Sequence, residues 1–345
     1  MPGSLHISAG LAGWCDGGYV VMEYARLGGT ELAVSRLGYG CAAMGGYDYG
    51  RVSDEESVRG VQLALALGIN LFDTADVYGF GHAEQVLGSA LGPRKNDVII
   101  ATKFGVRWDS RGRTVRDTSA SWVGQAVEGS LRRLGVDCIP VCQIHWPDDR
   151  TPIAETLEAL RRLQVAGKVR YVGCCNFDAK GFDEVQMHGR VESLQLPYSL
   201  VERQWEETIR HCFQRHRVAV LSYSPLAQGL LTGKYGAASR FEGTDLRKRS
   251  PLFRGETVQS NLATVERLKV VGARHKRTAG QVAIRWILDN SSVTCAVAGI
   301  KTPEQVEENA GALEWTLSEE DRGFLVGASL TAFGGTGEMP GVVGE

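Results

Sequence analysis

Short apolar segments alternate with helical patterns along most of the chain. The run from Val98 to Thr102 is typical of a buried strand, and the segment from Val123 to Leu134 repeats apolar residues every three to four positions. Eight such units follow one another without a polar linker, which predicts an α/β protein built as a single closed (β/α)8 TIM barrel. The predicted strands are Val34–Gly40, Ile69–Asp73, Val98–Lys103, Ile139–His145, Val169–Asn176, Ser193–Leu196, Ala219–Ser222 and Val293–Ala298.

A doubly wound parallel sheet is the alternative to a barrel. That fold usually needs a phosphate-binding loop after an early strand, and neither GxGxxG nor GxxxxGK[ST] occurs in the chain. The first regular pattern begins at Met22. We therefore expect residues 1–21 to form an extension outside the barrel, residues 22–332 to form the barrel, and residues 333–345 to form a Gly-rich tail.

Composition and charge limit the cellular location and the kinds of partner expected for the protein. The 345 residues carry 38 Lys+Arg against 40 Asp+Glu, so charge gives no reason to expect a nucleic acid or a membrane surface as partner. The eight cysteines show neither zinc-ribbon nor CxxC spacing, which favours reduced thiols and a cytoplasmic location. No apolar run approaches the ~18 residues of a membrane span, and the first 21 residues lack the pattern of a secretory signal.

Polar side chains stand at the ends of successive predicted strands, where barrel chemistry is placed. Asp73, Lys103 and His145 end three strands, and Tyr78 follows in a loop. A structural ion pair between Asp73 and Lys103 is one interpretation. Together with Tyr78 and His145 they indicate acid/base work, because a neighbouring Lys stabilises a phenolate and makes Tyr a better proton shuttle.

Six ordered sequence blocks resemble the aldo-keto reductases, including bacterial members and sugar dehydrogenases similar to L-galactose dehydrogenase. The resemblance runs from about residue 22 to 330 and implies an oxidoreductase that uses NAD(P). The blocks are Asp73-Thr74-Ala75-Asp76-Val77-Tyr78-Gly79, Ala101-Thr102-Lys103-Phe104-Gly105, Gln143-Ile144-His145-Trp146-Pro147-Asp148, Val172-Gly173-Cys174-Cys175-Asn176-Phe177, the segment Ser222 to Lys234, and the segment Gly299 to Asn309.

The resemblance implies roles for individual residues. Tyr78 would be the general acid that protonates a carbonyl oxygen as hydride arrives, Lys103 paired with Asp73 would tune it, and His145 would orient the carbonyl. No metal is implied. The residues implied in cofactor binding are Cys175, Asn176 and Gln195 at the carboxamide, Tyr223 on the ring, Ser224, Pro225, Leu226, Gln228, Gly229, Leu230 and Lys234 around the pyrophosphate, and Gly299, Lys301, Gln305, Glu308 and Asn309 at the adenosine end.

NADP is the expected cofactor, with NAD possible. Lys301 and the helix start at Thr302-Pro303 favour a 2′-phosphate, because a helix N-terminus and a Lys both attract negative charge. Three departures from the family pattern bear on this expectation. Cys175 replaces the usual Ser, Gln305 stands where many NADP-specific members have Arg, and the strand Ile139-Pro140-Val141-Cys142 lacks the usual Asp-Leu-Tyr.

The substrate is expected to be a small aldehyde, ketone or sugar, and the sequence leaves its identity, the direction of the reaction and the oligomeric state open. Met44, Tyr47, Trp108 and Trp146 stand at loop positions able to line an apolar pocket, although ordinary loop packing explains Met44 and Tyr47 equally well. Two other functions are retained. One is a cofactor-binding regulatory subunit similar to potassium-channel β subunits, and the other is a metal-dependent barrel lyase or isomerase using Asp73, Asp76 and His145.

Overall fold

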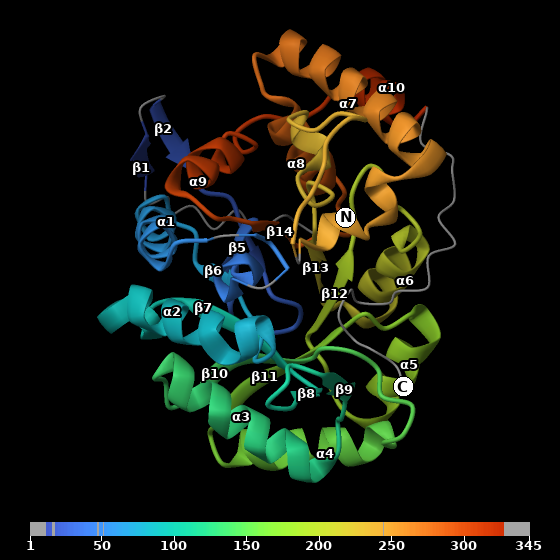
Figure 1. Ribbon diagram of the computed structural model, residues 1–345. Helices are drawn as coiled ribbons and strands as arrows, with labels where there is room; N and C mark the ends of the chain where they lie inside the picture. The colour runs from blue at the N-terminus through green and yellow to red at the C-terminus, as the bar shows by residue number, and fades with distance from the viewer. Residues whose placement is uncertain (1–11, 16–17, 47, 51, 244, 328–345) are drawn as a thin grey trace.

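A closed barrel of eight parallel strands forms the centre of the protein (Figure 1). The computed structural model describes residues 12–15, 18–46, 48–50, 52–243 and 245–327. The strand β14 pairs with β5 and closes the barrel, so no barrel edge is left unpaired. In order around the barrel the strands are β5 (Leu37–Gly40), β6 (Leu71–Asp73), β7 (Ile99–Phe104), β10 (Ile139–Ile144), β11 (Val169–Cys175), β12 (Ser193–Pro197), β13 (Ala219–Tyr223) and β14 (Cys295–Gly299).

Helices return the chain along the outside of the barrel and cover the strands, which confirms the predicted α/β barrel. In α3 the apolar stripe faces inward, Ser119 caps the start by accepting the Trp122 N–H, and Gly135 ends the helix with a φ of +66°. The helices are α1 (Asp54–Ala66), α2 (His82–Leu91), α3 (Ala120–Leu134), α4 (Ile153–Val165), α5 (Ala179–His188), α6 (Glu206–His216), α7 (Gly255–His275), α8 (Ala279–Leu288), α9 (Pro303–Ala310) and α10 (Glu319–Val326), with 3₁₀ turns at η1 (Ala42–Gly45), η2 (Tyr78–Gly81), η3 (Gly92–Asn96), η4 (Leu230–Thr232), η5 (Leu246–Lys248) and η6 (Pro251–Phe253).

The predicted first strand, Val34–Gly40, is wrong in its first half. Residues Ala33–Ser35 form β4, which pairs antiparallel with β3 (Tyr24–Arg26), and only Leu37–Gly40 enters the barrel as β5. Leu27 and Val34 are fully buried and pack with apolar residues of the barrel interior such as Leu71. The hairpin therefore closes the end of the barrel where the strands begin, and the chemistry is left to the opposite end.

Two more hairpins lie outside the barrel sheet. The strands β1 (Ala12–Cys15) and β2 (Gly18–Val21) form a separate two-stranded sheet in the segment where no regular pattern was predicted. The strands β8 (Val106–Trp108) and β9 (Thr114–Arg116) follow β7 and were also not predicted. The expected C-terminal tail lies outside the described residues. Within the described part of the chain, every helix is too short or too polar to cross a membrane.

Candidate active site

The predicted catalytic residues all lie at the end of the barrel where the strands finish. Asp73 is the last residue of β6, Lys103 is in β7, and His145 directly follows β10. Lys103 is level with Gln143 of β10, and Gly173 of β11 is level with Gln143 in turn. A Cβ at Gly173 would lie 2.3 Å from Ser193 Oγ and 2.8 Å from Gln143 Cγ, so this glycine leaves the space that the Gln143 side chain fills.

Asp73 and Lys103 form a buried ion pair. Lys103 Nζ lies 2.7 Å from Asp73 Oδ1 and also donates to the Thr74 carbonyl oxygen at 2.9 Å. The two side chains are 0% and 6% exposed, so each charge depends on the other for compensation. Removing one partner would leave an unpaired charge in the barrel, which costs about 3–5 kcal/mol.

Tyr78 is held against this pair by a tight turn. Its Oη lies 3.5 Å from Lys103 Nζ, and its ring meets the His145 ring edge-on with centroids 5.8 Å apart. Gly79, with a φ of +58°, follows directly, and a Cβ there would lie 2.3 Å from the Gly45 carbonyl oxygen. Because neither Gly45 nor Gly79 has a Cβ, their backbones can lie in contact. The loop after β6 can therefore place the Tyr78 phenol over Lys103.

Burial fixes the protonation states of Tyr78 and His145. Burial, and next to it the charge of Asp73, raises the pKa of Tyr78 well above its usual value, so the phenol keeps its proton. Burial and the charge of Lys103 lower the pKa of His145 well below its usual value, so the imidazole is neutral. The site therefore holds a phenol that can give a proton and a neutral ring that can donate one hydrogen bond.

The side chains implied at the carboxamide form a connected network. Gln195 Nε2 donates to Asp73 Oδ2 at 2.7 Å, and Cys175 Sγ lies 3.6 Å from Gln195 Oε1. Asn176 Nδ2 donates to the His145 carbonyl oxygen at 2.9 Å, while Tyr223 Oη donates to Asn176 Oδ1 at 2.9 Å. Asn176 adopts a φ of +66°, a conformation that Asn tolerates better than most residues. The structure therefore brings all these residues beside Asp73 and His145.

The loop after β13 has the winding backbone expected of an anion cradle. Ser224, Ala227, Gln228 and Gly229 all have positive φ, and such turns point successive N–H groups into one hollow. Some of these donors are already used, since Ala227 N–H bonds the Ser224 carbonyl and Gly229 N–H bonds the Leu226 carbonyl. These two N–H groups are therefore not available to an anion. Leu230 is fully buried and anchors the loop, while Lys234 lies over the Tyr235 ring.

A buried polar atom without a partner lies where the implied cofactor and substrate are expected. Within the described residues, His145 Nδ1 and Gln228 Oε1 are both buried and accept or donate no hydrogen bond. An unmet buried polar group costs about 1–3 kcal/mol, which a ligand that reaches it removes. His145 Nδ1 lies among the predicted catalytic residues. Gln228 Oε1 lies in the predicted pyrophosphate loop, but as an acceptor it pairs with a donor and not with a phosphate oxygen.

The implied adenosine end lies around the start of α9. Lys301 N–H donates to Gln305 Oε1 at 2.8 Å, and Lys301 Nζ bonds the Tyr49 carbonyl oxygen. Glu308 accepts from Thr278 Oγ1 at 3.3 Å, and Asn309 is buried in α9. Around Gly299, a Cβ would meet nothing within 4 Å, so the backbone faces open space.

Arg247 joins this end of the site, and sequence reasoning missed it. It forms an ion pair with Asp245 and stacks over Phe241 at 4.7 Å. Burial lowers the pKa of Lys301, and the charge of Arg247 lowers it further, so the two cations influence each other. The segment around Arg247 is held against the loop after β5, because Leu246 N–H donates to the Asp48 carbonyl oxygen at 2.8 Å. The basic and aromatic run near Arg247 was the available signal.

Two tryptophans lie where a substrate pocket was expected. Trp146 is buried and stacks beside His145 with ring centroids 6.4 Å apart. Trp108 lies in β8 and contacts the Phe80 ring at 6.0 Å. Met44 is 1% exposed and belongs to the hydrophobic core, as the packing alternative expects. Tyr47 lies outside the described residues.

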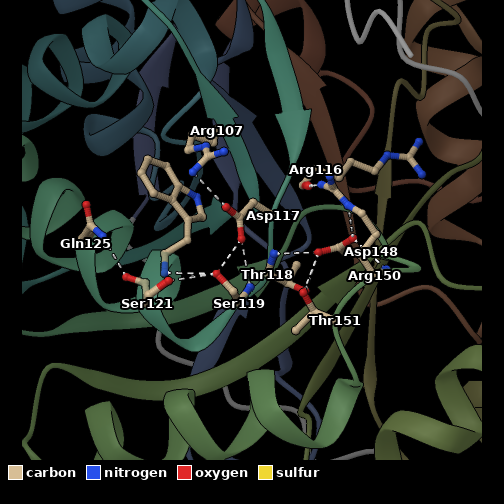
Figure 2. A network of polar contacts seen from close by, with 11 residues as sticks. Arg107, Arg116, Asp117, Thr118, Ser119, Ser121, Gln125, Asp148, Arg150 and Thr151 are labelled. Carbon is tan, nitrogen blue, oxygen red and sulfur yellow. Dashed lines mark hydrogen bonds and ion pairs between the residues drawn. The ribbon is translucent and has the colours of Figure 1, made fainter. Parts of the chain in front are cut away.

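A polar network around Asp148 links the segment after β9 to the loop after β10, as Figure 2 shows for Arg116, Thr118, Asp148, Arg150 and Thr151. Asp148 accepts from the Thr118 N–H at 3.0 Å and from Thr151 Oγ1 at 2.9 Å, and Arg150 bonds the Arg116 carbonyl oxygen. Burial opposes the charge of Asp148, but hydrogen bonds from Thr118 and Arg150 outweigh it and lower its pKa. Asp148 therefore connects the β8–β9 hairpin to the loop that carries Trp146.

The metal-dependent alternative needs Asp73, Asp76 and His145 to share one ion, and the structure does not bring them together. Asp73 accepts hydrogen bonds from Lys103 and Gln195 through its two carboxylate oxygens. Asp76 is buried, and burial followed by the charge of Glu84 raises its pKa well above the usual range, which favours a neutral carboxyl. Among the described residues, three such ligands converge only at Asp183, His211 and His216, on the outer helices.

Comparisons with known proteins agree with this geometry. The model of the Aldo/keto reductase family matches residues 36–325. The chain is 36% identical over 304 residues to the aldo-keto reductase YhdN of Bacillus subtilis, covering 87% of this chain and 92% of the relative. It is 33% identical over 316 residues to the NADH-specific methylglyoxal reductase of Escherichia coli, covering 87% and 96%. The structure of a glycerol dehydrogenase from Gluconobacter oxydans is similar with a TM-score of 0.82 at 34% identity, covering 92% and 99%.

Proposed function

This chain belongs to the aldo/keto reductase family, and we propose that it is an NADP(H)-preferring carbonyl reductase in which Tyr78 transfers the proton. It is an NAD(P)-dependent oxidoreductase that acts on small carbonyl compounds or the corresponding alcohols. The observation that carries the proposed proton path is the buried chain Asp73–Lys103–Tyr78 beside His145, with 2.7 Å and 3.5 Å between successive polar atoms.

The nicotinamide cofactor supplies or accepts a hydride when it is bound. Tyr78 donates its Oη proton to the carbonyl oxygen during reduction and takes a proton back during oxidation. Lys103 stabilises the phenolate that forms, because its ammonium lies 3.5 Å from Tyr78 Oη. Asp73 holds that ammonium in place through the buried ion pair. The loss of a proton from a phenol costs less free energy when a fixed cation lies beside the phenolate than when no charge is near it.

His145 orients the carbonyl in this proposal. Its low pKa keeps the ring neutral, so it polarises the oxygen through a hydrogen bond and leaves the proton transfer to Tyr78. Asn176 and Gln195 would hold the carboxamide and Tyr223 the ring. Gln195 is already bonded to Asp73, which connects cofactor position to the catalytic pair. Cys175 offers only a weak hydrogen bond where the family commonly has Ser.

The preference for NADP(H) rests on positive charge at the adenosine end. Lys301, Arg247 and Lys234 influence one another electrostatically there, and Asp245 balances one of these charges. The 2′-phosphate of NADP carries about two negative charges, which this cluster of cations can bind. The neutral ribose of NAD gains no such attraction. Tyr49 takes one N–H of Lys301, and an ammonium group has further donors for a phosphate.

We expect the pocket over the site to take a small substrate. Trp108 and Trp146 would form its apolar walls, and the Asp148 network holds them at a fixed separation. The named relatives act on methylglyoxal and glycerol, which supports a short polar carbonyl or alcohol as the substrate class. The seven cysteines whose side chains the structure describes are free thiols, which supports our proposal of a cytoplasmic location.

The test is a turnover and titration experiment. The purified protein is assayed with NADPH and NADH on short aldehydes, ketones and sugars, including methylglyoxal, and with glycerol in the oxidative direction. We expect reduction with NADPH to have the highest kcat/KM. Binding of cofactor without turnover on any compound would instead favour the regulatory-subunit alternative.

The cofactor preference is tested with Lys301→Ala. A partly exposed lysine–phosphate contact is worth about 1–2 kcal/mol, so the variant should bind NADPH ~5–30-fold more weakly and NADH nearly unchanged. Lys168→Ala is the matched control, because Lys168 is partly exposed just before β11, at the opposite end of the barrel, and pairs with Glu128. Equal weakening of both cofactors by Lys301→Ala would show that this lysine does not distinguish the 2′-phosphate.

A further inference from the structure

Two neighbouring helices on the outside of the barrel bring two histidines to one carboxylate. Asp183 lies in the middle of α5, and both histidines belong to α6 (Figure 1). His211 Nε2 lies 2.9 Å from Asp183 Oδ1, and His216 Nε2 lies 2.5 Å from the same oxygen. None of these residues contributes to the catalytic group, which stands at the ends of the strands.

The three side chains present their ligand atoms to a common point. One nitrogen of each imidazole and one carboxylate oxygen all lie within 4.8 Å of one another. Two imidazole nitrogens and a carboxylate oxygen are a donor set that Zn²⁺ binds in many proteins, with solvent completing a tetrahedron. A metal ion placed between them would replace the direct contacts with bonds of about 2.0–2.2 Å, which needs only small side-chain rotations.

The cluster is sheltered but reachable. The side chains of His211, Asp183 and His216 are 35%, 32% and 16% exposed, so the site is neither sealed nor fully solvated. Two surface hollows of about 540 and 480 Å³ flank it, and Asp183 lines both. Water can therefore supply the remaining ligands of a bound ion.

The surrounding charges permit a divalent cation. Both carboxylate oxygens of Asp183 face the imidazoles, since Oδ1 contacts both rings and Oδ2 lies 3.1 Å from His211 Nε2. Among the described residues, Arg215 is the one arginine or lysine that forms an ion pair with Asp183, with its Nε 3.7 Å from Asp183 Oδ1. Its side chain is 64% exposed and can turn into solvent when a metal takes its place.

We propose that Asp183, His211 and His216 form a binding site for Zn²⁺ or a similar divalent transition metal, which links α5 to α6. The helix α5 begins at its cap Asp178, two residues after Asn176, so the metal would stabilise the wall next to the proposed cofactor site. The site is structural, because it lies away from the reacting groups. Catalysis needs no metal in this proposal.

The test uses Zn²⁺ alone as the probe, with the full-length chain. Isothermal titration should give one Zn²⁺ per chain. His211→Gln and His216→Gln should each weaken Zn²⁺ binding at least about tenfold. Loss of a residue that only hydrogen-bonds to a metal ligand typically weakens binding that much, so loss of a ligand should weaken it at least as far. At a Zn²⁺ concentration about 100 times Kd, the melting temperature of the unmodified protein should rise by about 4 °C.

His275→Gln is the matched control. His275 pairs with Asp321 at 2.7 Å beside Arg274, which reproduces the carboxylate, the arginine and one histidine but lacks the second imidazole. This variant should bind Zn²⁺ as the unmodified protein does. Circular dichroism checks the fold of each variant, and the more exposed His211→Gln decides the outcome if His216→Gln does not fold. No binding, or binding that both α6 variants leave intact, would overturn the proposal.

Discussion

Glu202 should make the stability of this protein depend on pH near neutrality. It follows β12 in a short bridge with Ser199, and burial raises the pKa of its carboxyl from 4.5 to about 7. Its charge is also one of those that raise the pKa of Tyr223, after burial itself, so it acts close to the proposed ring-binding tyrosine. No sequence motif marked this residue.

The sign follows from the raised pKa. The folded protein holds the Glu202 proton more tightly than the unfolded chain, so this contribution is full below pH 4.5 and is lost as pH rises to about 7. Each tenfold change in proton affinity corresponds to about 1.36 kcal/mol, which makes the whole displacement about 3 kcal/mol. Because the side chain is only partly buried, solvent screening reduces the expected effect to about 2 kcal/mol.

Glu202→Gln keeps the shape of the protonated side chain at every pH. We expect the variant to match the unmodified protein near pH 4.5 and to be more stable by about 2 kcal/mol at pH 8, which is a rise of about 3 °C in melting temperature for a chain of this size. Urea unfolding of both proteins at the two pH values measures this difference. Glu207→Gln, at an exposed position paired with Arg210, should show no such dependence. An equal effect of Glu202→Gln at both pH values would refute the reasoning.

Three further predictions concern the parts that position the site. Gly45→Ala should lower kcat at least about tenfold, because the added Cβ would lie 2.5 Å from the Gly79 nitrogen and displace Tyr78. Gly124→Ala is the control and should leave kcat unchanged, because a Cβ at Gly124 meets open space. Asp148→Asn should raise KM more than it lowers kcat, since the tryptophan walls lose a charged tie worth about 1.5–3 kcal/mol, and an unchanged KM in steady-state assays would contradict this. A chain that starts at Met22 should keep its melting temperature and activity, because the β1–β2 sheet is separate from the barrel; a loss of several degrees would show that the extension packs against it.

The barrel could be predicted from the sequence because buried parallel strands and amphipathic helices leave distinct periods. All eight barrel strands appear close to their predicted positions. The division between Val34 and Leu37 could not be predicted, because an apolar run looks the same whether it pairs in a hairpin or in a barrel. The hairpins β1–β2 and β8–β9 were missed, since their strands have only three or four residues.

The meeting of the proposed catalytic residues at one end of the barrel could be predicted for a different reason. Asp73, Lys103 and His145 each mark the end of an apolar strand, and the barrel brings such ends to one face. Arg247 and Asp148 had no such mark. Arg247 reaches the adenosine end only because residues 245–249 bond to the loop at Asp48. Asp148 gains its role from two segments about 30 positions apart in the chain that meet only in the fold.

The central claim is that Tyr78 supplies the proton, and single-turnover hydride transfer in Tyr78→Phe tests it most directly. The variant removes one hydroxyl, so the fold and the affinity for NADPH should persist while the rate of the chemical step falls by ~10²–10⁴-fold. Tyr39→Phe is the matched control, because Tyr39 is fully buried and its hydroxyl has no hydrogen-bond partner among the described residues. Hydride transfer in a folded Tyr78→Phe protein at the rate of the unmodified enzyme would contradict the account.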